Sequence, residues 1–233
     1  MLENRLRTAY DLYKTCSLAA DIGTDHGLLP AALLRSGRCR QMILTDLSEK
    51  ALSHARGEME RQNLMERVSL RSGNGLEPLH EACDMISILG MGGRTIADIL
   101  QSGKEKIRNA DLLLSAHTDL PQVRQAVMNI GYHLQSETPC CDRGRYYLIF
   151  VAQPGPEALT ETEIMLGKKL ISSSSPALLP YLQHQQQVLR NKISGLKQAT
   201  HLSGEQIHKT EELLLELSHM IRSVSSGKAE QQV

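Results

Sequence analysis

The stretch 20-ADIGTDHGLLP-30 lies between a short apolar run and a helical pattern, and it decides the fold. Gly23 has no Cβ, so a ligand can approach the backbone of this turn closely. The turn lacks the G-x-G-x-x-G order typical of dinucleotide-binding loops and the Gly-Lys-Ser/Thr ending of a phosphate-binding loop. Its glycine spacing therefore favours a nucleotide-like ligand without a phosphate chain.

Strand-like runs alternate with longer helical patterns around this turn. The runs typical of strands are 18–22, 41–46, 67–71, 84–90, 111–116, 132–137 and 146–153. The patterns typical of helices are 2–13, 28–37, 48–63, 94–103 and 119–131. Asp119 and Pro121 form a good helix start. Nearly continuous apolar strands separated by helices predict a parallel sheet covered on both faces, and the last two strands predict an antiparallel hairpin at one edge.

The composition changes after residue 155, where strand candidates end and two long helical patterns follow. Apolar residues recur along both patterns, at Leu182, Leu189 and Leu196 and then at Ile207, Leu214, Leu217, Ile221 and Val224. We expect a catalytic domain over residues 1–155 and an antiparallel coiled-coil hairpin over 156–233, with a short link at 200–205 and a frayed tail from about Ser225. The hairpin either stabilises the protein or grips a substrate.

Charge and cysteine content limit the function classes. Lysine plus arginine number 26 and aspartate plus glutamate 26, so the formal net charge is zero, which counts mildly against a nucleic-acid binder. We find no apolar run long enough to cross a membrane, no signal peptide at the start, and no metal-binding or disulfide spacing among five cysteines. We expect a cytoplasmic protein with reduced thiols, no metal and no membrane contact.

Three further motifs follow the ends of predicted strands. Asp46 comes about 20 residues after the glycine turn and can accept both hydroxyls of a ribose; the alternative is that Asp46 or Ser48 caps the next helix. Asn74 can hydrogen-bond an adenine edge or belong to an ordinary Asn-Gly turn. The stretch 90-GMGGR-94 holds three glycines in four residues, which indicates close backbone approach to a ligand.

Taken together, the motifs resemble the bacterial tRNA (adenine(22)-N1)-methyltransferase family, TrmK. The resemblance is carried by 20-ADIGTDHGLLP-30, 44-LTDLS-48, 72-SGNGLEPL-79 and 89-LGMGG-93, and it extends over the helical tail. It implies a Rossmann-like class I methyltransferase domain, S-adenosyl-L-methionine as cofactor, and tRNA as partner, with methylation at N1 of adenosine 22. The chain departs from the family pattern at Asn74, at 115-SAH-117 and in 142-DRGRYY-147.

The resemblance also implies roles for single residues. Asp25 matches the aspartate associated with catalysis, and a carboxylate there can accept a hydrogen bond from N6 of adenine and remove its proton after attack by N1. The alternatives are that Asp25 caps the helix starting near Leu28 and that His26 makes a structural hydrogen bond. The residues implied in cofactor binding are Asp21, Gly23, His26, Asp46, Leu47, Asn74, Gly75, Gly90, Met91 and Gly92.

Two other functions stay open at this point. One is a methyltransferase acting on another RNA or on a small molecule, against which the helical tail counts. The other is a non-catalytic RNA-binding protein with a vestigial cofactor pocket, against which the intact glycine turn counts. Candidate contacts to RNA are Arg94, Arg143, Arg145, the group Arg35 to Arg40, and Tyr146. The residues leave the oligomeric state open, with a monomer favoured.

Overall fold

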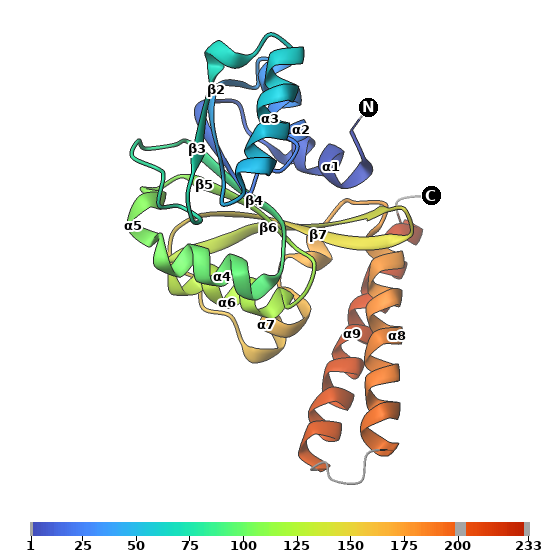
Figure 1. The fold of residues 1–233 in the computed structure, drawn as a ribbon. Coiled ribbons are helices and arrows are strands. Elements are labelled where there is room, and N and C mark those ends of the chain that lie inside the picture. The colour runs from blue at the N-terminus through green and yellow to red at the C-terminus, as the bar shows by residue number, and fades with distance from the viewer. Residues whose placement is uncertain (1, 199–203, 231–233) are drawn as a thin grey trace.

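The computed structural model describes residues 2–198 and 204–230, and seven strands in these residues form one sheet (Figure 1). The strands are β1 (Cys16–Ile22), β2 (Cys39–Asp46), β3 (Val68–Ser72), β4 (Met85–Met91), β5 (Asp111–Ala116), β6 (Tyr132–Asp142) and β7 (Arg145–Pro154). Their order is β3-β2-β1-β4-β5-β7-β6, with β1 to β5 parallel and β7 antiparallel to both β5 and β6. The predicted parallel sheet with an antiparallel hairpin at one edge is confirmed.

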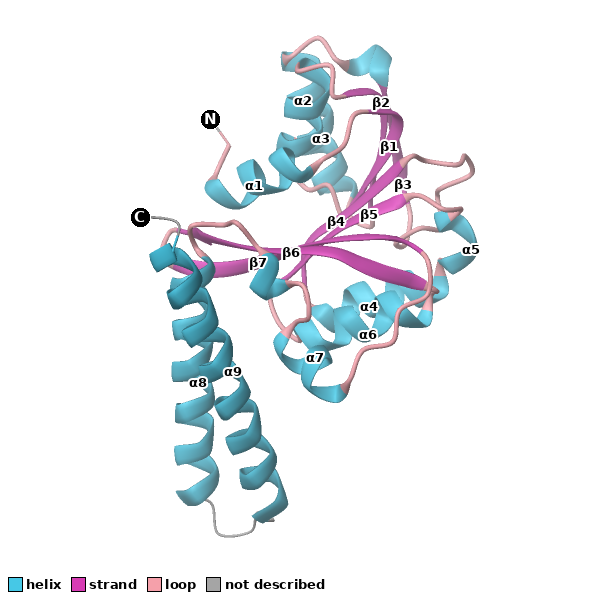
Figure 2. Ribbon diagram, turned by 180° about the vertical axis from the view of Figure 1, so that it is seen from behind, coloured by secondary structure: helices cyan, strands magenta, loops and turns pink. Residues whose placement is uncertain are grey.

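Helices cover both faces of the sheet, as Figures 1 and 2 show from opposite sides. One face packs against α1 (Asn4–Leu12), α2 (Leu28–Arg35) and α3 (Glu49–Arg61), which share a hydrophobic cluster with the strands. The other face packs against α4 (Gly93–Ser102), α5 (Lys104–Ile107) and α6 (Leu120–Asn129). Single turns of 3₁₀ helix lie at Met65–Arg67 and Leu170–Ser172. Because both faces are covered, β1 buries Ala19, Ala20 and Ile22 together, as its continuous apolar run predicts.

The parallel register brings the predicted motifs to one edge of the sheet. Ile22 pairs with Thr45 on one side and with Ile88 on the other, so β1, β2 and β4 end at the same level. The glycine turn after β1, Asp46 at the end of β2, and the glycine cluster after β4 therefore lie at the same edge, where open α/β sheets bind their ligands.

α6 begins where the sequence predicts, directly after Asp119 and with Pro121 in its first turn. Asp119 precedes the helix, but its backbone is left-handed (φ 53°) and its side chain makes no capping hydrogen bond. The adjacent turn packs tightly on α4: a Cβ added to Gly93 would lie 2.3 Å from the Asp119 carbonyl oxygen, and the Gly93 N–H donates to Thr118 O at 3.0 Å. The predicted helix start at Asp119 and Pro121 is confirmed, although the Asp119 side chain makes no capping hydrogen bond.

The C-terminal segment forms α7 (Glu161–Leu166), α8 (Leu178–Gln198) and α9 (Gly204–Glu230). The last two pack side by side and antiparallel, since Gln186 hydrogen-bonds Ser218 at 2.9 Å and Lys197 pairs with Glu211 at 2.7 Å. They project away from the sheet in Figure 1. The frayed tail expected from about Ser225 is wrong as far as Glu230, where α9 ends, and the remaining residues 231–233 lie outside the described part of the chain.

Other expectations for this segment are not settled by these contacts. Most of the predicted link at 200–205 lies outside the described residues. A division into domains 1–155 and 156–233 and a supercoiled geometry of the two helices stay predictions. Leu182 and Leu217 belong to the same hydrophobic cluster as strands β4 and β5, so the base of the hairpin packs directly against the sheet domain. No helix in the described part of the chain is both long and apolar enough to cross a membrane.

Candidate functional site

A cavity of about 520 Å³ lies at the edge of the sheet where β1, β2 and β4 end, and we call it the crevice cavity. The predicted site residues that line it are Asp21, Gly23, Asp25, His26, Asp46, Gly90 and Met91. Arg5 of α1 and His117, which follows β5, line it as well. The sequence did not predict Arg5 as a site residue, because it lies on α1 and not in a turn that follows a strand.

Four predicted cofactor-binding residues flank the crevice cavity and are not among the residues that line it: Leu47, Asn74, Gly75 and Gly92. The Thr45 hydroxyl donates to the Gly75 carbonyl at 3.5 Å, and the Gly73 N–H donates to the Asp46 carbonyl at 3.1 Å. Leu47 is 70% exposed although it directly follows Asp46. The turn after β3 therefore lies beside the end of β2.

Asp25 does not cap α2. The residue before that helix is Gly27, and no side chain makes a capping hydrogen bond there. Asp25 itself has a left-handed backbone (φ 44°), which is uncommon for a residue other than glycine and occurs often at functional sites. Its carboxylate is exposed, and one oxygen lies 3.6 Å from His26 Nε2. The capping alternative is wrong, and the Asp25 carboxylate is free to contact a ligand.

Of the two residues that the sequence offered as caps of α3, Ser48 caps the helix and Asp46 does not. The Ser48 hydroxyl accepts a hydrogen bond from the Ala51 N–H at 3.3 Å and so caps α3. The Asp46 carboxylate accepts from the Ser48 N–H at 2.8 Å and from the Asp25 N–H at 3.5 Å. These two backbone donors fix the orientation of the Asp46 carboxylate at the wall of the crevice cavity.

His26 is held mainly by ring packing. Its ring stacks on that of His54 in α3, with centroids 4.9 Å apart and planes at 10°. Ligand atoms of Asp25, His26 and His54 all lie within 4.8 Å of one another, and all three residues are exposed. Nitrogen and carboxylate ligands of this kind suit a transition metal. The absence of a metal therefore stays a prediction.

Asp21 is a buried carboxylate at the floor of the crevice cavity, and it is only 6% exposed. It accepts a hydrogen bond of 2.6 Å from the hydroxyl of Ser87, its partner in the pairing of β1 with β4. Burial raises the pKa of Asp21 to about 6, against the opposing effect of the Ser87 hydrogen bond. The buried Thr24 hydroxyl lies beside this carboxylate and, like the Ser87 hydroxyl, opposes the rise in its pKa. The floor thus offers a carboxylate and a polar hydroxyl to a ligand.

The raised pKa of Asp21 predicts how stability depends on pH. The folded protein favours the protonated carboxyl, so the stability contributed by Asp21 falls as pH rises from about 4 to about 6 and is constant above that. Asp21→Asn removes the buried charge and is expected to raise the unfolding free energy by up to about 3 kcal/mol near pH 8, and by much less near pH 4. Urea unfolding of wild type and Asp21→Asn at both pH values measures the gain in unfolding free energy. An equal gain at pH 4 and pH 8 contradicts the raised pKa of Asp21.

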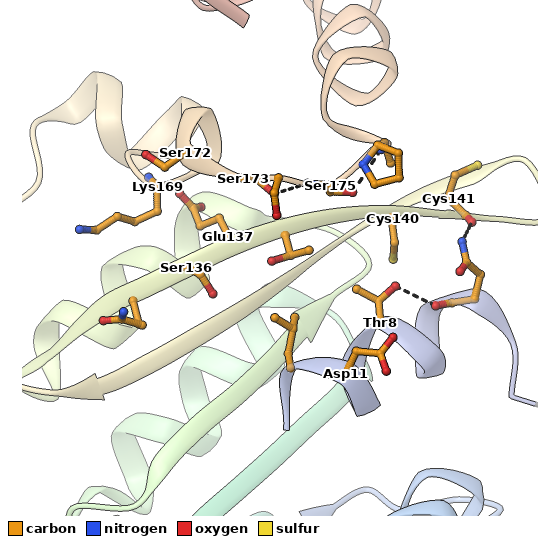
Figure 3. Close-up of a pocket in the computed structure, with 17 residues that line it drawn as sticks. Thr8, Asp11, Ser136, Glu137, Cys140, Cys141, Lys169, Ser172, Ser173 and Ser175 are labelled. Carbon is orange, nitrogen blue, oxygen red and sulfur yellow. Dashed lines mark hydrogen bonds between the residues drawn. The ribbon is translucent and has the colours of Figure 1, made fainter. Parts of the chain in front are cut away.

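A second cavity, of about 640 Å³, lies apart from the predicted motifs, between α1, β6 and residues 169–177. Figure 3 shows Thr8 and Asp11 on one side of β6 and Ser173 and Ser175 on the other. None of the predicted site residues lines it. The crevice cavity is therefore the candidate functional site, although it is the smaller of the two.

Comparison with known proteins identifies methyltransferases as relatives of this chain. A family model described as a methyltransferase domain matches residues 2–150. The tRNA (adenine(22)-N(1))-methyltransferase of Bacillus subtilis is 30% identical over 156 residues, which are 66% of this chain and 66% of that protein. The resemblance expected from the sequence motifs is thereby confirmed.

Solved structures share the fold over nearly the whole chain. The crystal structure of Streptococcus pneumoniae Sp1610 has a TM-score of 0.85 and 24% identity, covering 95% of this chain and 100% of that one. M. capricolum TrmK in complex with S-adenosyl-homocysteine has a TM-score of 0.81 and 23% identity, covering 96% and 99%. These likenesses confirm the Rossmann-like fold with its C-terminal helices. The family model described as a methyltransferase domain matches more than half of this chain, and the chain therefore belongs to that family.

Proposed function

We propose that the protein transfers a methyl group from S-adenosyl-L-methionine to N1 of adenosine 22 in tRNA. The observation that carries the proposal is the crevice cavity, which brings Asp25 next to the turn of Gly23 and to Asp46. Support for the substrate comes from the similarity to the Bacillus subtilis enzyme. The reaction class follows from the family, and the choice of tRNA position rests on that relative.

The residues present fit S-adenosyl-L-methionine. The terminal methyl of Met91 occupies the space beside Gly23, 2.1 Å from where a Cβ would lie, so a side chain at position 23 would displace Met91 in the cavity wall. The buried Asp21 carboxylate and the Thr24 hydroxyl beside it suit the charged amino-acid end of the cofactor. Asp46 suits the ribose hydroxyls, and the exposed Leu47 offers apolar surface to the adenine ring.

The remaining predicted contacts have supporting roles at this site. Asn74 and Gly75 flank the adenine, while Gly90 and Met91 line the cavity beside the reacting groups. Gly92 lies next to this wall, and His26 lies beside the Asp25 carboxylate. When bound, the cofactor supplies a methyl group on a positively charged sulfur, which is already electrophilic. The protein therefore contributes mainly alignment of the reacting atoms.

Asp25 provides the proton chemistry. N1 of adenine attacks with its in-plane lone pair, and the methylated base carries a positive charge until N6 loses a proton. The Asp25 carboxylate accepts the hydrogen bond from N6, stabilises the growing charge and then takes the proton. His26, whose Nε2 lies 3.6 Å from that carboxylate, keeps it directed into the cavity.

The rest of the chain serves tRNA binding in this proposal. Position 22 lies in the D arm, where the base is paired or stacked, so the target adenine has to leave the stack. We assign residues 156–233 to a second domain that contacts tRNA or stabilises the catalytic domain. Of the predicted arginine contacts, Arg143 is paired with Glu3. The protein acts as a monomer in the cytoplasm in this proposal.

Removal of metal is expected to leave the reaction unchanged. Methyl transfer from a sulfonium needs no Lewis acid, and Asp25 rather than an ion handles the proton. The protein is dialysed against EDTA and assayed in metal-free buffer, with tRNA that needs no refolding in magnesium. The methylation rate should stay within about twofold of the rate of untreated protein. A loss that zinc restores would instead place a functional ion at Asp25, His26 and His54.

The test of the proposed function is methylation of unmodified tRNA. Purified protein, labelled S-adenosyl-L-methionine and tRNA transcripts are incubated, and 1-methyladenosine is mapped by nuclease digestion and mass spectrometry. We expect one methyl group at adenosine 22 and none on a transcript with guanosine at that position. Methylation of another RNA or of a small metabolite, with none on tRNA, overturns the proposal.

A further inference from the structure

A third cavity, of about 390 Å³, opens where β7 continues past the end of β5. In the described residues β5 pairs with β7 only opposite Phe150–Ala152, so the start of β7 borders open space on that side. We call it the hairpin cavity, and it is lined by His117, Gly144, Arg145, Tyr146, Tyr147 and His184. His117 lines the crevice cavity as well, so the two cavities meet at this side chain.

Aromatic rings stand at both ends of the hairpin cavity. Tyr146 and Tyr147 point to opposite faces of the sheet because consecutive strand residues alternate. Tyr146 is occupied by contacts with α8: its ring lies 5.1 Å from that of His184 and 6.1 Å from that of Tyr181. Tyr147 instead meets the His117 ring edge-on, with centroids 5.8 Å apart. The Tyr147 end therefore adjoins the crevice cavity, whereas the Tyr146 end fastens α8 to the sheet.

One arginine lies against the Tyr147 ring, and a second lines the hairpin cavity. The Arg5 guanidinium carbon lies 5.5 Å from the centre of the Tyr147 ring. A Cβ added to Gly90 would lie 3.4 Å from Arg5 Nη1 and 3.7 Å from His117 Nε2, so both side chains close around the end of β4. No carboxylate is present among the described residues that line the hairpin cavity, and Arg145 is exposed at its rim. Aromatic rings combined with positive charge suit a nucleotide, whose base stacks while its phosphate meets arginine.

We propose that the hairpin cavity receives the adenine that is to be methylated, with Tyr147 as its stacking surface and His117 as the contact that turns N1 towards the crevice cavity. This assignment rests on the proposed function, since it names where that reaction's target base binds. A base on Tyr147 has His117 at its edge and Gly90 beyond, the wall shared with the cofactor's proposed site. The exposed Arg145 is placed to meet the phosphate of the extruded nucleotide.

Photochemical labelling tests this placement directly. A tRNA transcript with a single 8-azidoadenosine at position 22 is irradiated with wild-type protein, with S-adenosyl-homocysteine in excess so that the cofactor's own adenine site is filled. Tryptic peptides are mapped by mass spectrometry. We expect the label on His117 or on residues 144–147. Label confined to other residues, such as those of the cavity in Figure 3, overturns the assignment.

Kinetics of matched variants provide the second measurement. Stacking of a base on an aromatic ring is strong enough that Tyr147→Ala should raise KM for tRNA about 10- to 100-fold, while Tyr147→Phe, which keeps the ring, should stay within about twofold. His117→Ala should raise KM similarly, and His80→Ala, at an exposed histidine outside both cavities, should not. In His117→Ala the melting temperature should be unchanged, and affinity for S-adenosyl-homocysteine should change much less than KM for tRNA, because no proposed cofactor contact is assigned to His117 although it lines the crevice cavity. This comparison separates base binding from folding.

The outcomes distinguish this inference from the proposed function. Wild-type protein that methylates tRNA but is labelled elsewhere, or an unchanged KM in both His117→Ala and a folded Tyr147→Ala, overturns the cavity assignment and leaves the function standing. Protein that is labelled at His117 or residues 144–147 without methylating the tRNA overturns the function and supports the cavity as a binding site for an extruded adenine.

Discussion

Replacing Asp25 with asparagine is expected to lower the turnover of tRNA methylation by about 100- to 10,000-fold, the usual contribution of a positioned general base. Affinity for S-adenosyl-L-methionine should stay within about twofold, because the cofactor contacts are assigned to other residues of the cavity. Asparagine tolerates the left-handed backbone that Asp25 adopts at φ 44°. The substitution therefore removes the negative charge without the backbone strain that alanine would add.

Asp119→Asn is the matched control for this experiment. Asp119 also has a left-handed backbone (φ 53°), is exposed, and lies outside the crevice cavity. Single-turnover methylation of tRNA measures the chemical step, and calorimetry with S-adenosyl-homocysteine measures cofactor affinity. We expect Asp119→Asn to match the wild type in both. Turnover that survives in a correctly folded Asp25→Asn protein means that water or another group removes the N6 proton.

The sequence predicts the crevice cavity because its residues come directly after strands. Parallel strands end at one edge, so Gly23, Asp46 and Gly90 come together once the strand order is inferred from the alternation of strands and helices. Contacts that depend on which strands pair are not visible in this way. The hydrogen bond from Ser87 to Asp21 follows from the register of β1 with β4, and no local pattern marks Ser87 as its partner.

The sequence also did not predict which helical side chains reach the site, because these too are positioned by tertiary packing. His54 lies on α3 and stacks on His26, but helical periodicity shows only that His54 is on an exposed face. Arg5 reaches Tyr147 and Gly90 from α1, the first helix of the chain. Such side chains are placed by how a helix packs across the sheet, which depends on the whole core rather than on neighbouring residues.

The interface between the sheet and the C-terminal segment contains a buried ion pair that the sequence does not predict. Arg124 on α6 and Glu137 on β6 form an ion pair, Nε to Oε1 at 2.7 Å, and are 1% and 0% exposed. In the sequence both read as ordinary polar positions of an amphipathic helix and a strand. They are buried because the chain after residue 155 folds over them: Glu137 also accepts from the Lys169 N–H at 2.9 Å, and Arg124 donates to the Ile164 carbonyl at 2.8 Å.

Glycine is required where the chain crosses this pair. Gly167 ends α7 with φ 97°, and a Cβ added to it would lie 2.7 Å from Arg124 Nη2 and 2.8 Å from Glu137 Oε2. The backbone of residues 164–169 therefore packs directly on the two charged groups and supplies their remaining hydrogen bonds. Because each charge is fully satisfied only when all these partners are present, removing one of them leaves a buried charge uncompensated.

Glu137→Ala is accordingly expected to lower the unfolding free energy by about 3–5 kcal/mol, the usual cost of breaking a buried pair from one side. Guanidinium unfolding followed by circular dichroism measures the change. The double variant Arg124→Met, Glu137→Leu removes both charges and should lose less than Glu137→Ala alone, because no unpaired charge remains. Removing the exposed pair by Lys197→Ala should cost less than about 1 kcal/mol. If Glu137→Ala costs no more than Lys197→Ala, the Arg124–Glu137 pair does not hold the C-terminal segment against the sheet, and apolar contacts such as those of Leu182 and Leu217 do so instead.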